Sequence, residues 1–359
     1  MPSHPSSTAV GNKALSKAKS AKQDEFYTQL SDIENELRHY RDQFRNKVVL
    51  CNCDDPYESN FFRYFALNFN ALGLKKLITT CYDGSSVAGG RLPLLDIEGL
   101  KPDCKQPYAV EITNVPDAND DGAIDLTDVE LLLKSDGNVS HTLKGDAEYG
   151  AGDFRSAECV EFLKQADVVV TNPPFSLFRD FLALLIEHGK SFIIVGNMNA
   201  TTYKGVFTLI RDGKLWYGPS INSGDREFEV PEDYPLEAAN YRVDATGSKF
   251  IRVKGVRWYT NLDHSRRHEG LALYKSFDPE EFPRYDNYDA IEVKSYQHIP
   301  VDFDGVMGVP ITILDHYAPE QFEILGCNRD VEQDSSGYFG RSSILGGKET
   351  FKRVFIRRR

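Results

Sequence analysis

The sequence contains no run of about 18 apolar residues, the length that a membrane-spanning helix requires. Residues 1–21 are rich in serine, alanine and lysine, and they lack the apolar segment of a secretory signal peptide. We therefore expect no membrane span, and we interpret residues 1–21 as a flexible basic arm.

Cysteines are few and scattered along the chain. The six of them form no CxxC pair and, with the eight histidines, no cluster that has the spacing of a zinc site. Isolated cysteines of this kind are typical of proteins in a reducing cytoplasm, where we expect this protein to act.

The chain has no excess of basic residues; its formal net charge is −12. This balance argues against a chain that coats nucleic acid nonspecifically, although a local basic face would still allow an enzyme to act on DNA. Candidates for such a face are the basic arm, the loop with Arg266 and Arg267, and the basic tail at 348–359. The alternative for each is an ordinary solvated surface.

The most informative segment follows three valines at 168–170 and consists of Thr171, Asn172, Pro173, Pro174 and Phe175. The valines predict a short buried strand, which the prolines end because they cannot donate to a sheet ladder. The segment should therefore lie where open α/β sheets bind ligands, at the carboxyl end of a strand. An amide oxygen, a proline carbonyl and an aromatic ring together can hold a planar amino group. This arrangement is typical of amino-group methylation; the alternative is a rigid turn with a core phenylalanine.

Apolar periodicity predicts alternating helices and strands over the first two thirds of the chain. Helices are expected at residues 24–44, 61–72, 159–165 and 178–188, and buried strands at 47–53, 76–82, 168–170 and 191–195. Repeated strand–helix–strand units indicate a doubly wound, Rossmann-like α/β sheet with helices on both faces. From residue 222 onward, short strands with proline and glycine turns indicate a smaller α+β region with antiparallel pairing.

Five segments occur in the order found in one enzyme family, at residues 24–28, 53–56, 152–156, 171–175 and 257–261. Over residues 21–330 the chain resembles the EcoRI-type adenine-specific DNA methyltransferases. The resemblance implies transfer of a methyl group from S-adenosylmethionine to the exocyclic amine of an adenine in a specific double-stranded DNA sequence. It also implies a bacterial or phage-encoded enzyme, for which a cognate restriction endonuclease acting on the same site is a candidate partner.

At 359 residues, one large or two modest domains are expected. With the resemblance in view, residues 22–261 form the methyltransferase domain, which carries an insertion at about 84–151. Residues 262–359 then form a C-terminal region for target recognition and DNA contact.

The resemblance assigns one set of residues to S-adenosylmethionine: Phe26, Tyr27, Thr28, Asp54, Asp55, Pro56, Ser59, Asp83, Asp153 and Phe154. Aromatic rings would cover its methionine end, a carboxylate after the first strand would attract its ammonium, Asp83 would bond the ribose, and Asp153 with Phe154 would hold the adenine. Residues 58–60 replace the usual glycines of the family, so the path of the cofactor there is left open.

Several of these residues also have an ordinary structural interpretation. Tyr27 continues an apolar helix stripe, Asp54 could cap a helix, and Asp83 precedes a turn glycine. Asp153 and Phe154 could be a helix cap followed by a core residue.

The resemblance assigns catalysis to Asn172, Pro173, Pro174 and Phe175. The adenine amine is conjugated and poorly nucleophilic, so two acceptors on its protons would aim its lone pair at the methyl group. The base must first be flipped out of the duplex. Trp258 or Tyr259 would cover its second face, with Tyr259 preferred. Asn197 could line the same pocket, and Arg266 and Arg267 could contact DNA.

One segment has no role in methyl transfer. Residues 117–128 carry oxygen ligands at loop positions one, three, five and twelve, with glycine at six; the ligands are Asp117, Asn119, Asp121 and Asp128. This is the spacing of a calcium loop, with aspartate in place of the usual terminal glutamate. A structural calcium ion is therefore a candidate; the alternative is an acidic surface turn.

Two other functions fit the segment at 171–175. An RNA adenine or a protein glutamine presents the same planar amino group, and a non-catalytic relative could bind DNA with the fold alone. The basic termini favour nucleic acid over protein, and the intact segment at 171–175 favours catalysis.

Overall fold

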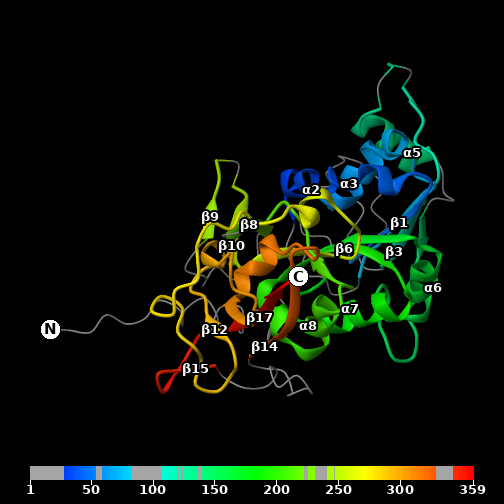
Figure 1. Cartoon of the computed structure of the whole chain (residues 1–359). Helices are drawn as coiled ribbons and strands as arrows, with labels where there is room; N and C mark the ends of the chain where they lie inside the picture. Colours follow the sequence, from blue (N-terminus) through cyan, green and yellow to red (C-terminus); the bar gives the residue numbers. More distant parts are fainter. Residues whose placement is uncertain are drawn as a thin grey trace. The chain divides into compact units, whose positions relative to one another are not determined.

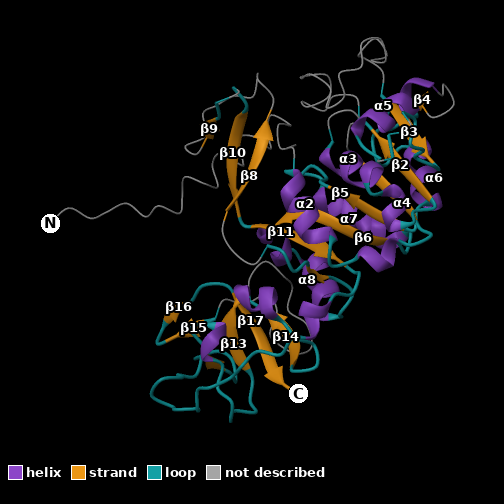
Figure 2. Cartoon of the chain, turned by 90° about the horizontal axis from the view of Figure 1, so that it is seen from above, coloured by secondary structure: helices purple, strands orange, loops and turns teal. Residues whose placement is uncertain are grey.

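The structure is a computed structural model that describes residues 28–53, 59–82, 107–119, 121–122, 124–135, 140–221, 225–230, 241–245, 247–328 and 343–359. Figures 1 and 2 show the chain from two directions. A sheet of eight strands carries helices on both faces, which confirms the predicted α/β class.

The strands of the main sheet follow the order β4-β3-β2-β1-β5-β6-β11-β7. In chain order they are β1 (Val48–Asn52), β2 (Lys76–Thr80), β3 (Tyr108–Ile112), β4 (Ser140–Thr142), β5 (Val168–Thr171), β6 (Ser191–Asn197), β7 (Trp216–Tyr217) and β11 (Val256–Thr260). The central strands β2, β1, β5 and β6 pair in parallel, as predicted. The outer pairs β2–β3, β3–β4 and β7–β11 are antiparallel, so the sheet is mixed.

The central strands are buried because their sequences are almost wholly apolar. Every residue of β1 and β5 is buried, as are residues 192–196 of β6. Strands covered by helices on both faces have this composition, whereas a strand with one wet face alternates polar and apolar residues. The predicted buried strands are confirmed.

Helices cover the two faces of the central strands. The α-helices of the described residues are α2 (Leu30–Leu37), α3 (Asn60–Leu67), α4 (Phe69–Leu72), α5 (Leu126–Ser135), α6 (Ala157–Gln165), α7 (Phe178–Glu187) and α8 (Lys204–Arg211). Helix α3 packs against α2 and α5 on one side of the sheet, and α6 and α7 lie on the other side (Figure 1). None of the described helices has the length and apolar content to cross a membrane.

Two predicted helices are interrupted. Helix α2 ends at Leu37, and the apolar stripe continues in a 3-10 turn at Arg41–Phe44. Between them Tyr40, with φ of −123°, leaves the helical region and donates its hydroxyl to buried Glu36. Likewise, α3 and α4 are separate, and Gly73 ends α4 with φ of +62°. From Leu37 to Tyr40 the apolar stripe keeps a spacing of three, which fits a 3-10 turn as well as an α-helix. The second break, at Asn68, separates two α-helices.

Part of the predicted insertion at 84–151 extends the main sheet. Strands β3 and β4 pair in turn beside β2, and α5 packs against α3. Strand β3 is a run of only five residues and β4 has three, all polar, so both are too short to give a clear strand signal in the sequence.

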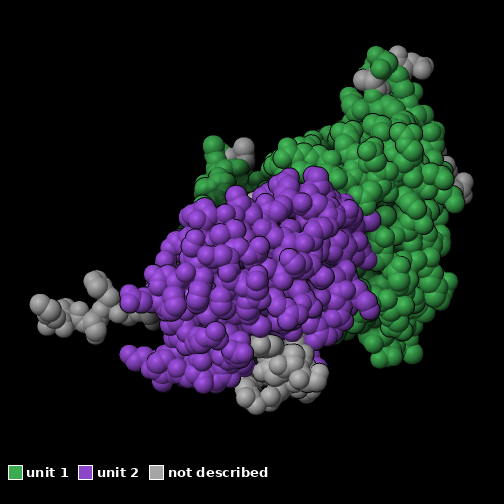
Figure 3. Space-filling view, in the orientation of Figure 1, with its two compact units in different colours: residues 1–197, 223–258 green, residues 198–222, 259–359 purple. Residues whose placement is uncertain are grey.

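The chain divides into two compact units, coloured separately in Figure 3. One unit comprises residues 1–197 and 223–258, and the other comprises residues 198–222 and 259–359. The predicted boundary at 261/262 lies close to the third crossing between the units, at 258/259. The segment at 198–222, predicted as part of the methyltransferase domain, clusters with the C-terminal unit, and the predicted domain bounds stay a prediction.

Smaller sheets complete both units. In the first unit, β8 (Asp225–Val230), β10 (Lys249–Lys254) and β9 (Tyr241–Val243) form an antiparallel sheet. The second unit has a four-stranded sheet and a hairpin built from β12 (Ile291–Glu292), β13 (Met307–Pro310), β14 (Phe322–Cys327), β15 (Ile344–Leu345), β16 (Lys348–Glu349) and β17 (Arg353–Arg358). Further 3-10 helices are Met198–Thr202, Ser265–His268, Tyr296–His298 and Ile311–His316.

A buried ion pair holds the second unit together. Arg353 of β17 donates from Nε and Nη2 to the carboxylate of Glu292, and Tyr285 donates its hydroxyl to the same carboxylate. The two charged side chains are 11% and 4% exposed. Burial and the Glu292 carboxylate raise the pKa of Tyr285, so its hydroxyl stays protonated. Arg353 is therefore a core residue and is not available to a basic DNA-binding tail.

We expect Arg353→Met to destabilise the second unit by about 3–5 kcal/mol, because it leaves the Glu292 carboxylate buried without its counter-charge. Arg357→Met is the matched control on the same strand. Its ion pair with Glu323 is about half exposed and contributes at most about 1 kcal/mol. Urea unfolding of the two variants measures the difference; equal stabilities would show that the buried pair is not structural.

Candidate active site

The sheet order places a topological switch point at the carboxyl ends of β1 and β5. Helix α3 leaves β1 toward β2, whereas α7 leaves β5 toward β6. The chain thus turns in opposite directions from two adjacent parallel strands, and ligands of open α/β sheets bind at such a switch point.

The predicted catalytic residues, Asn172 to Phe175, form a corner of the chain at this switch point. Asn172 directly follows β5 and is 8% exposed, both prolines are buried, and Phe175 is half-buried. The carbonyl of Pro174 accepts the backbone N–H of Leu177 (2.9 Å), which turns the chain into α7. Phe178 then packs on Gly196 of β6, where a Cβ atom would lie 2.4 Å from the phenyl ring. Packing on both sides therefore fixes the corner.

The first predicted cofactor segment meets the start of α3. The carbonyl of Thr28 accepts a hydrogen bond from Asn60 Nδ2 (2.9 Å). Thr28 is 6% exposed, and its hydroxyl has no hydrogen-bond partner among the described residues. Ser59 is the N-cap of α3, because its hydroxyl accepts the N–H groups of Phe61 (3.1 Å) and Phe62 (3.4 Å). Residues 28 and 59, far apart in sequence, are thus brought to the amino end of one helix beside β1.

The segment from Gly152 to Phe154 lies against the end of β2. Gly152 has φ of +75°, and a Cβ atom there would lie 1.9 Å from the carbonyl oxygen of Cys81. Only glycine allows this close approach. Asp153 and Phe154 are therefore held at the same sheet edge as Asn172, as the resemblance implies.

Two interpretations of Asp153 are open from the sequence, and the sequence did not predict that Arg155 is its partner. Asp153 does not cap α6, whose N-cap is Ser156. Its carboxylate instead accepts hydrogen bonds from Arg155 Nε (2.9 Å) and Nη2 (2.7 Å). The Arg155 guanidinium also lies over the rings of Tyr149 and Phe154, with 4.7 and 5.2 Å to the centroids. Arg155 thus orients the predicted adenine-binding carboxylate, and an arginine two residues after an aspartate was the available signal.

Phe154 has the core packing that was its alternative interpretation. It is 3% exposed and makes an edge-to-face contact with Phe181 of α7, with ring centroids 5.0 Å apart. One ring can serve both as core and as a wall of a ligand site, so this packing does not decide its role.

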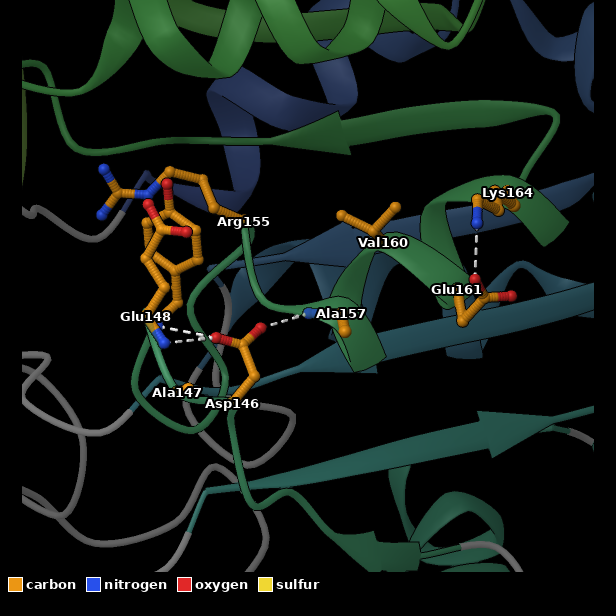
Figure 4. A pocket seen from close by; sticks show the side chains of 9 residues that line it. Asp146, Ala147, Glu148, Arg155, Ala157, Val160, Glu161 and Lys164 are labelled. Carbon is orange, nitrogen blue, oxygen red and sulfur yellow. Dashed lines mark hydrogen bonds and ion pairs between the residues drawn. The ribbon is translucent and has the colours of Figure 1, made fainter.

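A pocket of about 500 Å³ lies beside α6 (Figure 4). Asp146 lines it and accepts the N–H groups of Glu148, Tyr149 and Ala157. Its lining residues come from the segment at 146–155 and from α6 between Ala157 and Lys164, and none of them follows β1 or β5. We therefore do not assign the cofactor to it.

Six predicted cofactor residues lie outside the residues that the structure describes: Phe26, Tyr27, Asp54, Asp55, Pro56 and Asp83. Their roles stay predictions. The cap position of α3 belongs to Ser59, which removes the helix-cap alternative for Asp54 at that helix.

The rings predicted to stack on the target base are both buried. Trp258 is 0% exposed and makes an edge-to-face contact with Phe61. Tyr259 is also 0% exposed, and its hydroxyl hydrogen-bonds the Thr201 hydroxyl (3.0 Å). Either ring could meet a base only if this packing opened, because the strand that carries them is an inner strand of the main sheet. Sequence alternation alone could not reveal that both faces are covered.

Other predicted target residues have protein partners. Asn197, at the carboxyl end of β6, donates its amide to the carbonyl of Lys254 (2.8 Å). Arg266 Nη1 donates to the carbonyl of Pro219 (2.6 Å), and the Arg267 guanidinium stacks on Trp216, 3.6 Å from the ring centroid. DNA contact by these side chains stays a prediction.

The acidic loop at 117–128 uses its oxygens for backbone hydrogen bonds. Asp128 accepts the N–H groups of Asp125 (2.8 Å) and Ala118 (2.7 Å), bonds which lower the pKa of its carboxyl. Asp117 accepts the N–H groups of Asp121 and Gly122. In the described part of the chain, no group of three or more His, Cys, Asp or Glu side chains is arranged to hold a metal ion. Position seven, whose carbonyl is a ligand in calcium loops, lies outside that part.

The fold and the corner define a Rossmann-like methyltransferase. The sequence profile of the family described as adenine-specific methyltransferase EcoRI matches residues 14–358. A "Type II methyltransferase M.EcoRI" of Escherichia coli is 42% identical over 96% of both chains. A "Type II methyltransferase M.MpnI" of Mycoplasma pneumoniae is 36% identical over 96% of this chain and 98% of its own length. No solved structure matches.

The chain therefore belongs to the EcoRI family of adenine-specific methyltransferases. The family and the class of enzyme predicted from the five segments are confirmed. Family membership also favours an adenine over a protein glutamine as the acceptor.

We expect Gly152→Ala to lower the free energy of unfolding by more than about 2 kcal/mol, because a side chain at positive φ costs about 1–2 kcal/mol and the clash with Cys81 adds to it. Affinity for S-adenosylmethionine should fall as well, since the Asp153 turn is displaced. Gly150→Ala is the control, as a Cβ atom there meets nothing within 4 Å. Thermal unfolding and calorimetric titration measure both effects; a stable, tightly binding Gly152→Ala protein would contradict this account of the turn.

Proposed function

We propose that this protein transfers a methyl group from S-adenosylmethionine to the exocyclic amine of a flipped adenine in a specific double-stranded DNA sequence. The observation that carries the proposal is the Asn172–Phe175 corner, fixed at the switch point between β1 and β5. Membership of an adenine-specific family and relatives that are named type II methyltransferases support it.

The corner would act by orientation. The Asn172 side-chain oxygen and the Pro173 carbonyl would accept the two protons of the amine, and Phe175 would stack on the base. Two acceptors on those protons increase the lone-pair character of the nitrogen and fix its direction of attack. Positioning and electrostatics of this kind account for large rate effects without an activated nucleophile.

The residues at the switch point fit S-adenosylmethionine, which supplies an electrophilic methyl group when bound. Two buried oxygen atoms there have no hydrogen-bond partner among the described residues, the Thr28 hydroxyl and the Asn52 side-chain carbonyl. A ligand that donates hydrogen bonds would satisfy such atoms, and unsatisfied buried polar groups are costly. The Asp153 carboxylate, oriented by Arg155, would accept the cofactor's adenine amine, and Ser59 would support the loop before α3 by capping that helix.

DNA is the acceptor that we favour over RNA. The relatives are named type II methyltransferases, and we extend this activity to the present chain as part of the proposal. A cognate restriction endonuclease that acts on the same sequence would then be its functional partner. Transfer of labelled methyl groups to DNA and RNA in parallel separates the two acceptors.

We expect Asn172→Ala to reduce methyl transfer by about 10²–10³-fold, because the variant lacks a hydrogen-bond acceptor that works in the transition state. The chain would be expressed in a methylation-deficient bacterial host, whose genomic DNA is then read by modification-sensitive long-read sequencing. Methylated adenine in one sequence context, present with wild type and absent with the variant, is the expected result.

Asn114→Ala is the matched control, since Asn114 is an exposed asparagine in the loop after β3. It should leave methylation unchanged. Unmodified DNA from a host that contains folded, cofactor-binding protein would redirect the proposal to RNA. An Asn172 variant as active as wild type would show that the active site lies elsewhere.

Calcium binding by the loop at 117–128 is a separate proposal that rests on its ligand spacing. If the site exists, millimolar calcium should raise the melting temperature, and Asp121→Ala should abolish that rise. Magnesium is measured in parallel, because it is smaller and demands octahedral geometry, so it reports the ion preference of the loop. No shift with calcium would leave the loop as an acidic surface turn.

A further inference from the structure

Three polar side chains, those of Asn52, Thr80 and Thr171, form one row at the carboxyl edge of the parallel strands. Residues paired in register point to the same face of a parallel sheet, and Asn52 of β1 pairs with Thr80 of β2. Leu50 pairs with Val169, so Thr171 occupies the equivalent place on β5, two residues further on. All three side chains are buried, with exposures of 2% or less.

This row is polar, whereas the row before it on the same three strands is apolar. That preceding row consists of Ile78, Leu50 and Val169, all fully buried and apolar. Polar groups in such a place are retained at a cost unless they are hydrogen-bonded. On this face Thr80 lies against the thiol of Cys159 in α6, so the row faces the helix that follows the Asp153 turn.

Thr171 joins two strands that separate at this point. The β1–β2 ladder continues to the last residue of β1, and the β5–β6 ladder continues to Thr171. The β1–β5 ladder, in contrast, comprises only the pairs Val49 with Val168 and Leu50 with Val169. Beyond it, the Thr171 hydroxyl donates a hydrogen bond to the backbone carbonyl of Asn52. A side chain thus makes the connection where the ladder has ended.

The backbone after this bond is held in an uncommon conformation. Cys53, the next residue, has φ of +65°. Such a conformation of a non-glycine residue costs about 1–3 kcal/mol and persists only where the surroundings fix it. The bond from Thr171 is one contact that fixes the preceding carbonyl.

We propose that Thr171 is a positioning residue, whose hydroxyl sets the spacing between the carboxyl ends of β1 and β5. The inference rests on the proposed function, in which the segment after β1 holds the methyl donor and Asn172 holds the amine. Thr171 is adjacent to Asn172 in the chain, and its bond reaches the last residue of β1. The bond therefore fixes the two reactants relative to each other and touches neither.

This role predicts a particular kinetic signature. Each ligand would keep its own binding residues when the bond is lost, so affinity for the methyl donor alone should change little. The reaction depends on the relative placement of the two groups, and a misplacement of about 1 Å can cost about 10²-fold in rate.

The test compares Thr171→Val, which is nearly isosteric and lacks the hydroxyl, with Thr171→Ser, which retains it. Single-turnover methyl transfer to unmethylated genomic DNA is measured at saturating S-adenosylmethionine, and calorimetry gives the dissociation constant of the cofactor. For the valine variant we expect a rate about 10- to 100-fold lower and a dissociation constant within about two-fold of wild type. The serine variant should keep a rate close to that of wild type. Thr171→Ala gives the same test if the valine variant does not fold.

Thr79→Val is the matched control, because Thr79 is also fully buried, lies on β2 and points to the other face. It should lose stability without a selective loss of rate. A wild-type rate for Thr171→Val would overturn the proposal, as would a parallel loss of rate and cofactor affinity. If the wild-type chain itself methylates no adenine in DNA, the proposed function fails rather than the role of Thr171.

Discussion

The parallel pairing of β2, β1, β5 and β6 is the constraint on which the site depends. Parallel strands bring their carboxyl ends to one edge, and the crossovers from β1 and β5 leave that edge in opposite directions. Segments that are more than 100 residues apart, at the ends of β1 and β5, thereby become neighbours. Every element of the candidate site is placed by its relation to this edge.

Local packing then fixes each segment at the edge. Gly152 lets the Asp153 turn approach the carbonyl of Cys81, Ser59 caps the helix after β1, and Gly196 leaves room for the ring of Phe178 behind the Asn172 corner. None of these residues has a reactive group. The two glycines work because a missing side chain permits a close approach that a larger one would prevent, and Ser59 works through the hydrogen bonds that its hydroxyl accepts.

Much of the architecture could be predicted because its signals are local. A run of valines, two prolines and a following apolar helix pattern identify β5, the corner and α7 without any tertiary information. Elements with weaker local signals were not predicted. The strands β3 and β4 are short, and the break after Leu37 keeps the spacing of an α-helix, so both emerge only when β2 and the core are present.

The sequence by itself determined the enzyme family, the central parallel strands and the segments that meet at the edge of the candidate site, because each depends on residues that are adjacent in the chain. Only the tertiary structure decided which partner each side chain takes. It paired Arg155 with Asp153, buried Arg353 against Glu292, covered Trp258 and Tyr259 on both faces, and joined Thr171 to the end of β1. These partners come from distant segments or depend on burial, and no spacing within the sequence records either.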